Sequence, residues 1–270
     1  MKHEQDSPLI SIVTVCRNSA DTIPRAFDSV LQQTYQQVDY VVVDGASSDG
    51  TVDIVRQYEA KFRSGGMQFR WISEPDEGIY DAINKGIAMT QGNIIGILNS
   101  DDCHEPHTLQ AVADASVVHP EVGIFYGFLR LLRDGKEIQV YRYRYEHYLL
   151  NLGLGIHSAA QHPTCFVRRD VYRQIGAFDP QFATTADYDF LIRAMQAGIK
   201  FYPLDAVLCN FRTGGATDHM TDEERYRQRY AIWYKNGLIG EDEYRKKRNQ
   251  LRYKRYKELK QRLVKWFFRF

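Results

Sequence analysis

The sequence predicts an α/β protein with a mostly parallel sheet. Short apolar, β-branched runs of strand length alternate with segments in which apolar residues recur every three or four positions. Three of these runs end in polar, acidic loops, and ligands bind beyond the carboxyl ends of strands in such sheets. Later in the chain, Asp134-Gly135 between two strand-like runs is a hairpin signal, which indicates that part of the sheet is antiparallel.

Four strands and three helices should alternate in the first hundred residues. The strands are expected at Leu9–Cys16, Asp39–Val43, Trp71–Ile72 and Asn93–Leu98, and the helices at about 21–31, Thr51–Tyr58 and Ile79–Met89. Asp21 is expected to cap the first helix, because its side chain can accept a hydrogen bond from the first turn. Pro24 also suits a first helical turn.

The second half is expected to change character. A helix should cover 103–118, a hairpin should join Gly123–Leu132 to Glu137–Tyr145, and two helices should cover Arg168–Ile175 and Tyr188–Ala197. Gly176 and Gly198 are placed to end these two helices. With no internal repeat or low-complexity linker, the economical division is one α/β domain at 1–217, followed by a loop and a basic helical tail at 218–270.

Composition and cysteine usage exclude several classes of protein. The 270 residues are 44% hydrophobic and carry a net charge of +1, so the chain can bury a core and offers no general reason to bind nucleic acid. Its four cysteines are scattered, with no pair at the spacing of a zinc site, which favours a reduced chain in the cytoplasm. The sequence contains neither a signal-peptide pattern nor an apolar run of membrane-spanning length.

The last 27 residues differ from the rest. Residues 244–270 hold twelve basic residues and one acid, which leaves 23 basic and 33 acidic residues before them. From Tyr253 to Phe270 apolar residues recur at steps of three or four. A basic amphipathic helix of this kind favours peripheral contact with an anionic membrane, here the cytoplasmic face of the cell membrane. The alternative is a helix that packs on its own domain or on a partner subunit.

The segment Asn99-Ser100-Asp101-Asp102 directly follows an expected strand and sets two carboxylates at the edge of the sheet. Hard oxygen donors suit Mg²⁺ or Mn²⁺, which usually bind one or two carboxylates together with substrate phosphates. A nucleoside diphosphate is therefore the implied ligand. The alternative is that Asp101 and Asp102 only cap a helix that begins near Glu105.

Two further aspartates lie at similar positions. Asp44 also ends an expected strand, and its carboxylate can accept a hydrogen bond from a base or a ribose. The alternative for Asp44 is an Asx turn. Asp187 lies at or just before an expected helix, where a carboxylate is often only an N-cap.

The order of these segments resembles the family 2 glycosyltransferases of GT-A fold, from about Leu9 to Thr217. The segments that carry the resemblance are Ser11-Ile12-Val13-Thr14-Val15-Cys16-Arg17-Asn18, Val41 to Thr51 with Asp44-Gly45-Ala46-Ser47-Ser48-Asp49-Gly50, Asn84-Lys85-Gly86, Leu98-Asn99-Ser100-Asp101-Asp102, Gly176-Ala177-Phe178-Asp179 and Ala186-Asp187-Tyr188-Asp189. The stretch from Ser73 to Gly86 resembles a subgroup that is common in bacterial exopolysaccharide and surface-glycan synthesis.

The resemblance implies a role for individual residues. Those implied to bind the nucleotide sugar are Thr14, Arg17, Asp44, Lys85 and Asp101. Asp102 is implied as the direct ligand of Mn²⁺ or Mg²⁺, with Asp101 or His219 as further candidates. Asp187 matches the catalytic base, and Asp189 is the second candidate. Ala186 stands where the family often has Glu, which weakens any role for that position in binding an acceptor.

These parts fit an inverting glycosyltransferase that moves a sugar, favoured as a UDP-sugar, to a glycan or lipid-linked acceptor. A sugar hydroxyl is a poor nucleophile and needs a positioned carboxylate to take its proton. A base on one side of the anomeric carbon and a cation on the other imply a single displacement. The glycine-rich loop from Phe211 to His219 is a candidate to close over the diphosphate, with Arg212 or His219 contacting phosphate or metal, although an exposed loop without function is the simpler interpretation.

Two other functions remain open from the sequence. A sugar-phosphate nucleotidyltransferase also combines an α/β sheet with Mg²⁺ and nucleotides, but no glycine-rich phosphate loop stands near the N-terminus. A non-catalytic scaffold that binds sugar nucleotides would tolerate the loss of Asp187.

Overall fold

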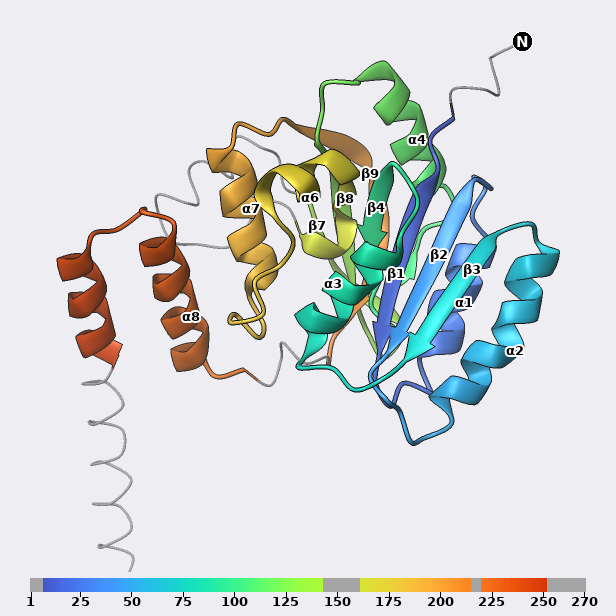
Figure 1. Cartoon of the computed structure of the whole chain (residues 1–270), viewed down its shortest axis with the longest axis horizontal. Helices are drawn as coiled ribbons and strands as arrows, with labels where there is room; N and C mark the ends of the chain where they lie inside the picture. Colours follow the sequence, from blue (N-terminus) through green and yellow to red (C-terminus); the bar gives the residue numbers. More distant parts are fainter. Residues whose placement is uncertain (1–6, 143–160, 215–219, 252–270) are drawn as a thin grey trace, which may run out of the picture. The chain divides into compact units, whose positions relative to one another are not determined.

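The computed structural model describes residues 7–142, 161–214 and 220–251 (Figure 1). The chain divides into two compact units, Met1–Gly215 and Ala216–Phe270. The first unit holds the sheet and the helices packed on it. The second unit is helical where it is described.

One mixed sheet organises the first unit. The strand order is β3-β2-β1-β4-β8-β6-β9-β5, and β7 pairs with β6. Its strands are β1 (Ile10–Cys16), β2 (Val38–Asp44), β3 (Gln68–Ser73), β4 (Ile94–Ile97), β5 (Cys103–His104), β6 (Ile124–Arg133), β7 (Lys136–Tyr141), β8 (Phe166–Arg168) and β9 (Phe201–Arg212). The neighbours β3, β2, β1 and β4 are all parallel, whereas β8 joins both β4 and β6 in antiparallel pairs. The predicted α/β fold with a mostly parallel sheet and an antiparallel part is confirmed.

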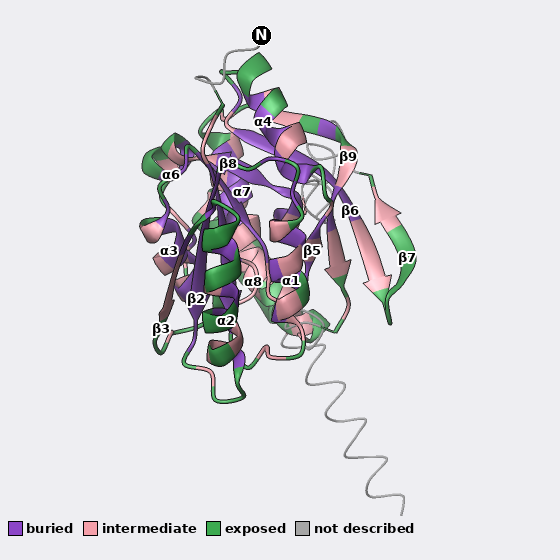
Figure 2. Cartoon of the chain, turned by 90° about the vertical axis from the view of Figure 1, so that its right-hand side faces the viewer, coloured by how far each residue is buried: buried purple, intermediate pink, exposed green. Residues whose placement is uncertain are grey.

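Helices cover both faces of the parallel strands. Successive side chains of a strand point to opposite faces, and Ile10 and Ile12 of β1 share a core cluster with Phe27 of α1 (Ile23–Leu31) and Phe62 of α2 (Thr51–Ser64). Val13 instead meets α3 (Ile79–Met89) on the other face. Strands β1, β2 and β4 are accordingly buried along their whole length, whereas the outer sides of the helices are exposed (Figure 2).

Aromatic rings fill the core under α1 and α2. Phe27, Tyr40, Phe62 and Phe69 lie with ring centroids 4.7 to 6.2 Å apart, mostly edge to face. Each ring is at most 5% exposed. Burying a side chain of this size stabilises the fold by about 1.5–3 kcal/mol.

Gly86 sets how closely α3 approaches the sheet. A Cβ atom at this position would lie 2.3 Å from a methyl group of Val13 and 3.4 Å from one of Val43. Only a residue without a side chain lets the helix backbone rest on these two strands. The close packing of α3 on the sheet therefore explains why a glycine ends the segment Asn84-Lys85-Gly86.

The second half of the first unit differs in part from expectation. The hairpin β6–β7 forms around Asp134-Gly135, both at positive φ, and α6 (Arg169–Ile175) and α7 (Ala186–Gln196) lie close to their expected ranges. The helix expected at 103–118 begins only at Thr108 as α4 (Thr108–Val118), because Cys103 and His104 pair with β9. Asp21 does not cap α1, since Thr22 occupies the N-cap position and no side chain caps it.

The second unit contains α8 (Asp222–Lys235) and a helix at 241–251. A capping box starts α8: the Thr221 hydroxyl accepts from the backbone N–H of Glu224, while the Glu224 side chain accepts from that of Thr221. Tyr234 stacks on Tyr244 at 4.8 Å, so the two helices contact each other. The predicted amphipathic stripe from Tyr253 to Phe270 lies outside the described residues.

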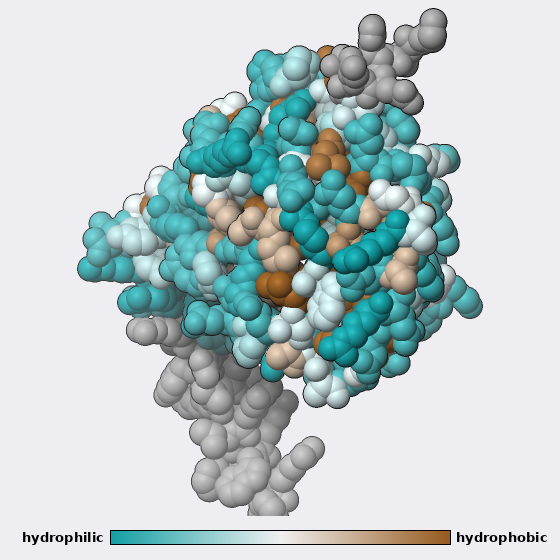
Figure 3. Space-filling view, turned by 45° about the vertical axis from the view of Figure 1, so that its right-hand side comes forward, coloured by the Kyte–Doolittle hydropathy of each residue, from teal (hydrophilic) through white to brown (hydrophobic). Residues whose placement is uncertain are grey.

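The surface in Figure 3 is mostly hydrophilic, and its hydrophobic side chains form small separate patches rather than one continuous area. Among the described residues, no helix has both the length and the apolar character needed to cross a membrane.

Candidate active site

The loops that follow the parallel strands meet at one edge of the sheet. The last residues of β1, β2 and β3 are in register, with Cys16 beside Asp44 and Asp44 beside Ser73. Beyond β1 and β4, the hydroxyls of Ser19 and Ser100 lie 2.9 Å apart. The segments predicted to bind a nucleotide are therefore neighbours.

Asp44 is fully buried at the centre of this edge. One carboxylate oxygen accepts from the backbone N–H of Ser47 at 2.9 Å and from the hydroxyl of Ser73 at 2.7 Å. The other oxygen accepts from the Ser47 hydroxyl and, at 3.5 Å, from the Cys16 thiol. The backbone donor is Ser47, three residues after Asp44, rather than the residue two positions on that donates in an Asx turn. These bonds fix the carboxylate where the strand ends and the loop begins. Binding of a base by Asp44 stays a prediction.

Thr14 and Arg17 lie on and beyond β1. The Thr14 side chain is fully buried, and its hydroxyl shares a hydrogen bond of 2.9 Å with the hydroxyl of Tyr40. Arg17 is exposed, and its Cβ lies 3.5 Å from the Cβ position of Gly45. The carboxylate of Asp76 covers the same glycine, where a Cβ would come within 2.2 Å of it. Asp76, which sequence reasoning did not single out, therefore adds another acid beside Arg17.

Asp101 and Asp102 follow β4 and are not helix caps. Asp102 is fully buried, and its oxygens accept from the backbone N–H of Arg212 at 3.0 Å and from the amide of Asn99 at 2.9 Å. Burial, together with the nearby charge of Asp101, raises the pKa of Asp102 to about 8. Burial also raises the pKa of the half-buried Asp101, and the charge of Arg212 acts against that shift.

The acid pair fits a divalent cation of the kind the sequence implies. Within the described ranges no group of three or more His, Cys, Asp or Glu residues forms a metal site, so the pair stands without a third such residue. Mg²⁺ and Mn²⁺ commonly bind just one or two carboxylates and take their other oxygens from substrate phosphates and water. A cation would also offset the cost of keeping a buried carboxylate charged. His219 lies outside the described residues.

Lys85 extends from α3 to the loop after β3. Its ammonium contacts the carboxylates of Glu74 at 3.0 Å and Asp81 at 3.2 Å and donates to the carbonyl of Pro75 at 2.9 Å. The hydrogen bond to Glu74, the largest cause, raises the pKa of Lys85. Lys85 therefore ties that loop to α3, and its predicted contact with a nucleotide sugar stays a prediction.

Asp187 lies in the first turn of α7, half-buried, and is not the N-cap, which is Thr185. Its Oδ1 accepts a hydrogen bond of 2.9 Å from the hydroxyl of Tyr80. Burial, with a smaller contribution from the charge of Asp187, raises the pKa of Tyr80 well above its usual value, so the tyrosine is the donor. An accessible carboxylate held by one neutral donor can accept a proton from a ligand.

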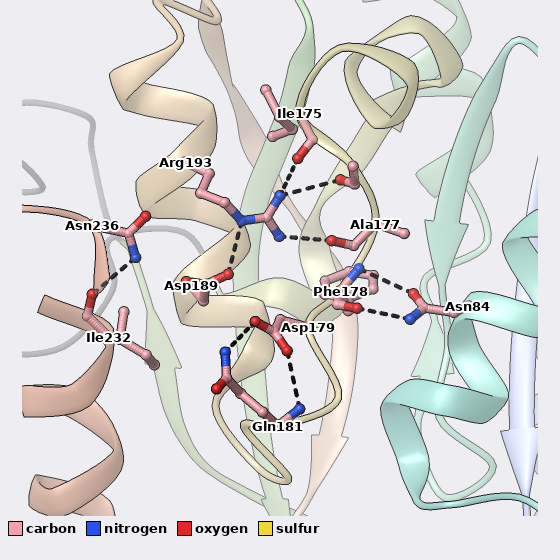
Figure 4. Close-up of polar contacts among 11 residues, drawn as sticks. Asn84, Ile175, Ala177, Phe178, Asp179, Gln181, Asp189, Arg193, Ile232 and Asn236 are labelled. Carbon is pink, nitrogen blue, oxygen red and sulfur yellow. Dashed lines mark hydrogen bonds and ion pairs between the residues drawn. The ribbon is translucent and has the colours of Figure 1, made fainter. Parts of the chain in front are cut away.

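Asp189 has different surroundings. It is fully buried and pairs at 2.8 Å with Arg193, one turn further along α7. Figure 4 shows the Arg193 guanidinium reaching the loop after α6, where it donates to the carbonyls of Ile175, Gly176 and, at 2.7 Å, Ala177. These contacts give Asp189 a structural role and support Asp187 as the first candidate for the base.

The same loop is held from its other side by Asn84 of α3 (Figure 4). The Asn84 amide donates to the carbonyl of Phe178 at 2.8 Å and accepts from its backbone N–H at 3.0 Å. Asn84 and Phe178 belong to motifs visible in the sequence, but the sequence predicts neither this contact nor that between Tyr80 and Asp187. Each contact joins residues about a hundred positions apart, and no local pattern signals such a pair.

Comparison with known proteins agrees with this architecture. Residues 11–176 match the family described as Glycosyl transferase family 2. An uncharacterized glycosyltransferase of Mycobacterium tuberculosis is 29% identical over 218 residues, which cover 79% of this chain and 78% of the relative. A PGL/p-HBAD biosynthesis glycosyltransferase of Mycobacterium bovis is 27% identical over 225 residues, or 81% of this chain and 82% of the relative.

Solved structures of similar fold include two with bound nucleotide sugars. TarS of S. aureus, residues 1–349 with UDP-GlcNAc, superimposes with a TM-score of 0.68 at 18% identity and covers 90% of this chain and 71% of its own. The mannosyltransferase PcManGT from Pyrobaculum calidifontis, with GDP-Man and Mn²⁺, gives a TM-score of 0.64 at 18% identity. The match covers 87% of this chain and 66% of PcManGT. With a family match over more than half of its length, this chain belongs to glycosyl transferase family 2 and is a glycosyltransferase.

Proposed function

We propose that this glycosyltransferase moves a sugar from a UDP-sugar to a hydroxyl of a glycan or lipid-linked acceptor, with inversion at the anomeric carbon and with the help of Mn²⁺ or Mg²⁺. The observation that carries the proposal is the pair of contrasting carboxylates in a family 2 domain. Asp102 is fully buried with neutral partners, as suits a cation ligand, whereas Asp187 is half-buried, as suits a base.

Asp187 takes the proton of the acceptor hydroxyl while that oxygen bonds to the anomeric carbon. The bond from this carbon to the diphosphate breaks in the same step, and the nucleoside diphosphate leaves with the electron pair. One displacement converts an α-linked donor into a β-linked product. A positioned general base contributes typically ~10²- to 10⁴-fold to the rate.

Asp102 and Asp101 would hold the cation, which when bound offsets the negative charge that develops on the diphosphate. Asp44 and Arg17, at the adjacent strand ends, would contact the nucleoside and the phosphates. The UDP-GlcNAc of TarS and the GDP-Man and Mn²⁺ of PcManGT support a nucleotide sugar and a divalent ion as the ligands of this edge of the sheet.

The proposed acceptor follows from a relative's name, from one sequence segment and from the basic tail. A relative is named for PGL/p-HBAD biosynthesis, and the stretch from Ser73 to Gly86 resembles enzymes of surface-polysaccharide synthesis. The basic tail favours an acceptor at an anionic membrane on the cytoplasmic side. Flotation with anionic liposomes, with and without residues 252–270, tests that contact, and equal partitioning of both chains would argue against it.

The decisive experiment replaces Asp187 by Asn, which keeps the shape of the side chain but removes its ability to take a proton. Transfer from the best donor of a nucleotide-sugar panel should fall by ~10²-fold or more, while donor affinity stays the same. Sugar transfer and donor binding are measured on one preparation. Near-normal transfer by Asp187→Asn, with loss in Asp189→Asn, would reassign the base.

A further inference from the structure

Helix α3 carries two side chains that reach the segments around Asp187. Tyr80 and Asn84 are four residues apart, so they lie on one face of the helix, one turn apart. Tyr80 donates to Oδ1 of Asp187 at 2.9 Å, and Asn84 holds both backbone polar groups of Phe178 at 2.8 and 3.0 Å. One helix face thus contacts both the proposed base and the loop that precedes it.

The ring of Phe178 joins these contacts into one packed cluster. Its centroid lies 5.5 Å from that of Tyr80 and 5.0 Å from that of Phe190, which belongs to α7 and is fully buried. Tyr80 is 8% exposed and Phe178 3%. Asn84 therefore fixes a ring against which both the tyrosine and the helix that carries Asp187 are packed.

The remaining contacts of α3 anchor it to the nucleotide side of the fold, which is the edge of the sheet where β1, β2 and β3 end. Gly86 brings the helix backbone against Val13 and Val43 of the two central strands. Lys85 ties it to Glu74 and Pro75 in the loop after β3. A helix held in this way cannot shift without disturbing the strand ends that carry Asp44.

We propose that Tyr80 and Asn84 are positioning residues for the transfer step: they fix the orientation of the Asp187 carboxylate relative to the nucleotide side of the fold. Tyr80 acts directly through its hydroxyl, and Asn84 acts through Phe178. The inference rests on the proposed role of Asp187 as the base.

The physical reason is that a carboxylate can rotate unless a donor fixes it. A single displacement requires the accepting oxygen to stay within hydrogen-bond reach of the acceptor hydroxyl while the new bond forms. In the described residues, the other titratable groups that interact with Asp187 are His162 and Cys165, both buried. Burial lowers the pKa of His162 and raises that of Cys165, so neither carries charge at neutral pH and the tyrosine remains the donor.

The test compares two buried tyrosines of the same aromatic cluster. Tyr80→Phe removes the hydroxyl that reaches Asp187. Tyr172→Phe removes a buried hydroxyl for which the described part of the chain offers no hydrogen-bond partner, although its ring stacks on Phe190 at 5.1 Å. Tyr80→Phe should lower kcat by roughly ten- to a hundredfold, the scale of one hydrogen bond to a charged group. Its KM for the donor should not change, and Tyr172→Phe should match the original chain in both quantities.

A double-mutant cycle separates positioning from simple support of the fold. If Tyr80 acts through Asp187, Tyr80→Phe should have no further effect on the residual rate of Asp187→Asn. Asn84→Ser should also lower kcat at constant donor KM. An equal loss in Tyr172→Phe, a raised donor KM, or additive effects in the cycle would overturn the inference. Full activity of Asp187→Asn would instead refute the proposed base, so the two failures are distinct.

Discussion

Two fully buried aspartates stand at opposite ends of the parallel strands, and their partners differ. Asp39 near the start of β2 accepts from Ser11 at 2.6 Å, from the backbone of Gln91 at 2.7 Å, and pairs with Arg70 at 2.5 Å. Within the described part of the chain, Asp102 beyond the end of β4 accepts only from the neutral groups of Asn99 and the Arg212 backbone. Across the described residues no ion pair includes Asp102.

The difference separates a structural acid from the acid that we propose as a cation ligand. A buried carboxylate is costly to keep charged unless a positive group compensates it. At Asp39 the chain supplies that group itself, in Arg70. At Asp102 burial instead raises the pKa to about 8, and among the described residues no ion pair compensates its charge, which the proposed cation would do. Asp39→Asn should therefore lower the stability of the fold, whereas Asp102→Asn should leave the chain folded and weaken cation-dependent binding.

The largest effect is expected at Asp39. Asp39→Asn removes the charge that pairs with Arg70. It also leaves one carboxylate oxygen fewer for the three donors, which are Ser11, the Gln91 backbone and Arg70. Because the Arg70 side chain is 32% exposed, water compensates part of the loss, and the free energy of unfolding should fall by about 3 kcal/mol. Urea denaturation measures it. An unchanged urea midpoint would show that Asp39 does not stabilise the fold.

A somewhat smaller effect should appear as lost ligand binding in Asp102→Asn. The original chain should gain about 2.7 kcal/mol of stability from UDP and Mn²⁺ at 100 times the dissociation constant, a rise of several degrees in Tm. The variant should remain folded and show little of this gain. UDP with EDTA in place of Mn²⁺ is the control, and a full Mn²⁺-dependent shift in the variant would show that Asp102 is not the ligand.

The smallest effect concerns the metal-free protein and pH. The folded-state pKa of Asp102, about 8, lies above the unfolded value of about 3.9, so the folded state holds the proton longer. The stability that this proton contributes is complete below about pH 4 and is lost as the pH rises through 8.

Between pH 5 and pH 6.5 the unfolding free energy of the original chain should fall relative to that of Asp102→Asn by roughly 2 kcal/mol. Burial also lowers the pKa of His104 to about 3. Because His104 is present in both proteins, its contribution to the pH dependence cancels in the comparison. Parallel pH profiles of the two proteins would contradict the assigned shift.

Local pattern was enough to predict the parallel half of the fold. The helix at Ile79–Met89 matches the sequence prediction in both bounds because its apolar residues recur at helical spacing. Strand β9 was not predicted, since Pro203 and Asp205 interrupt its sequence and both disfavour strands. It forms because it pairs along β6, a contact that a single sequence does not reveal. Missing β9 also led to the early start expected for α4.

The site divides in the same way. Asp44, Asp101 and Asp102 were found because each follows a strand-like run. Asp76 is not marked by any such pattern, and only folding brings it over Gly45. Tyr80, Asn84 and Arg193 likewise take their positions from tertiary packing, so the sequence revealed the acids but not the side chains that hold them.

The hydrogen bond from the Arg212 backbone to Asp102 has a consequence for folding order. It spans 110 residues, and the short strand β5 directly after Asp102 pairs with the same late segment, β9. During synthesis the strands β1 to β4 can emerge long before residue 212 leaves the ribosome. Asp102 therefore gains its bond from the Arg212 backbone only when β9 docks. A nascent chain that ends before this strand has a nearly whole parallel sheet, but the site of the proposed cation is unfinished.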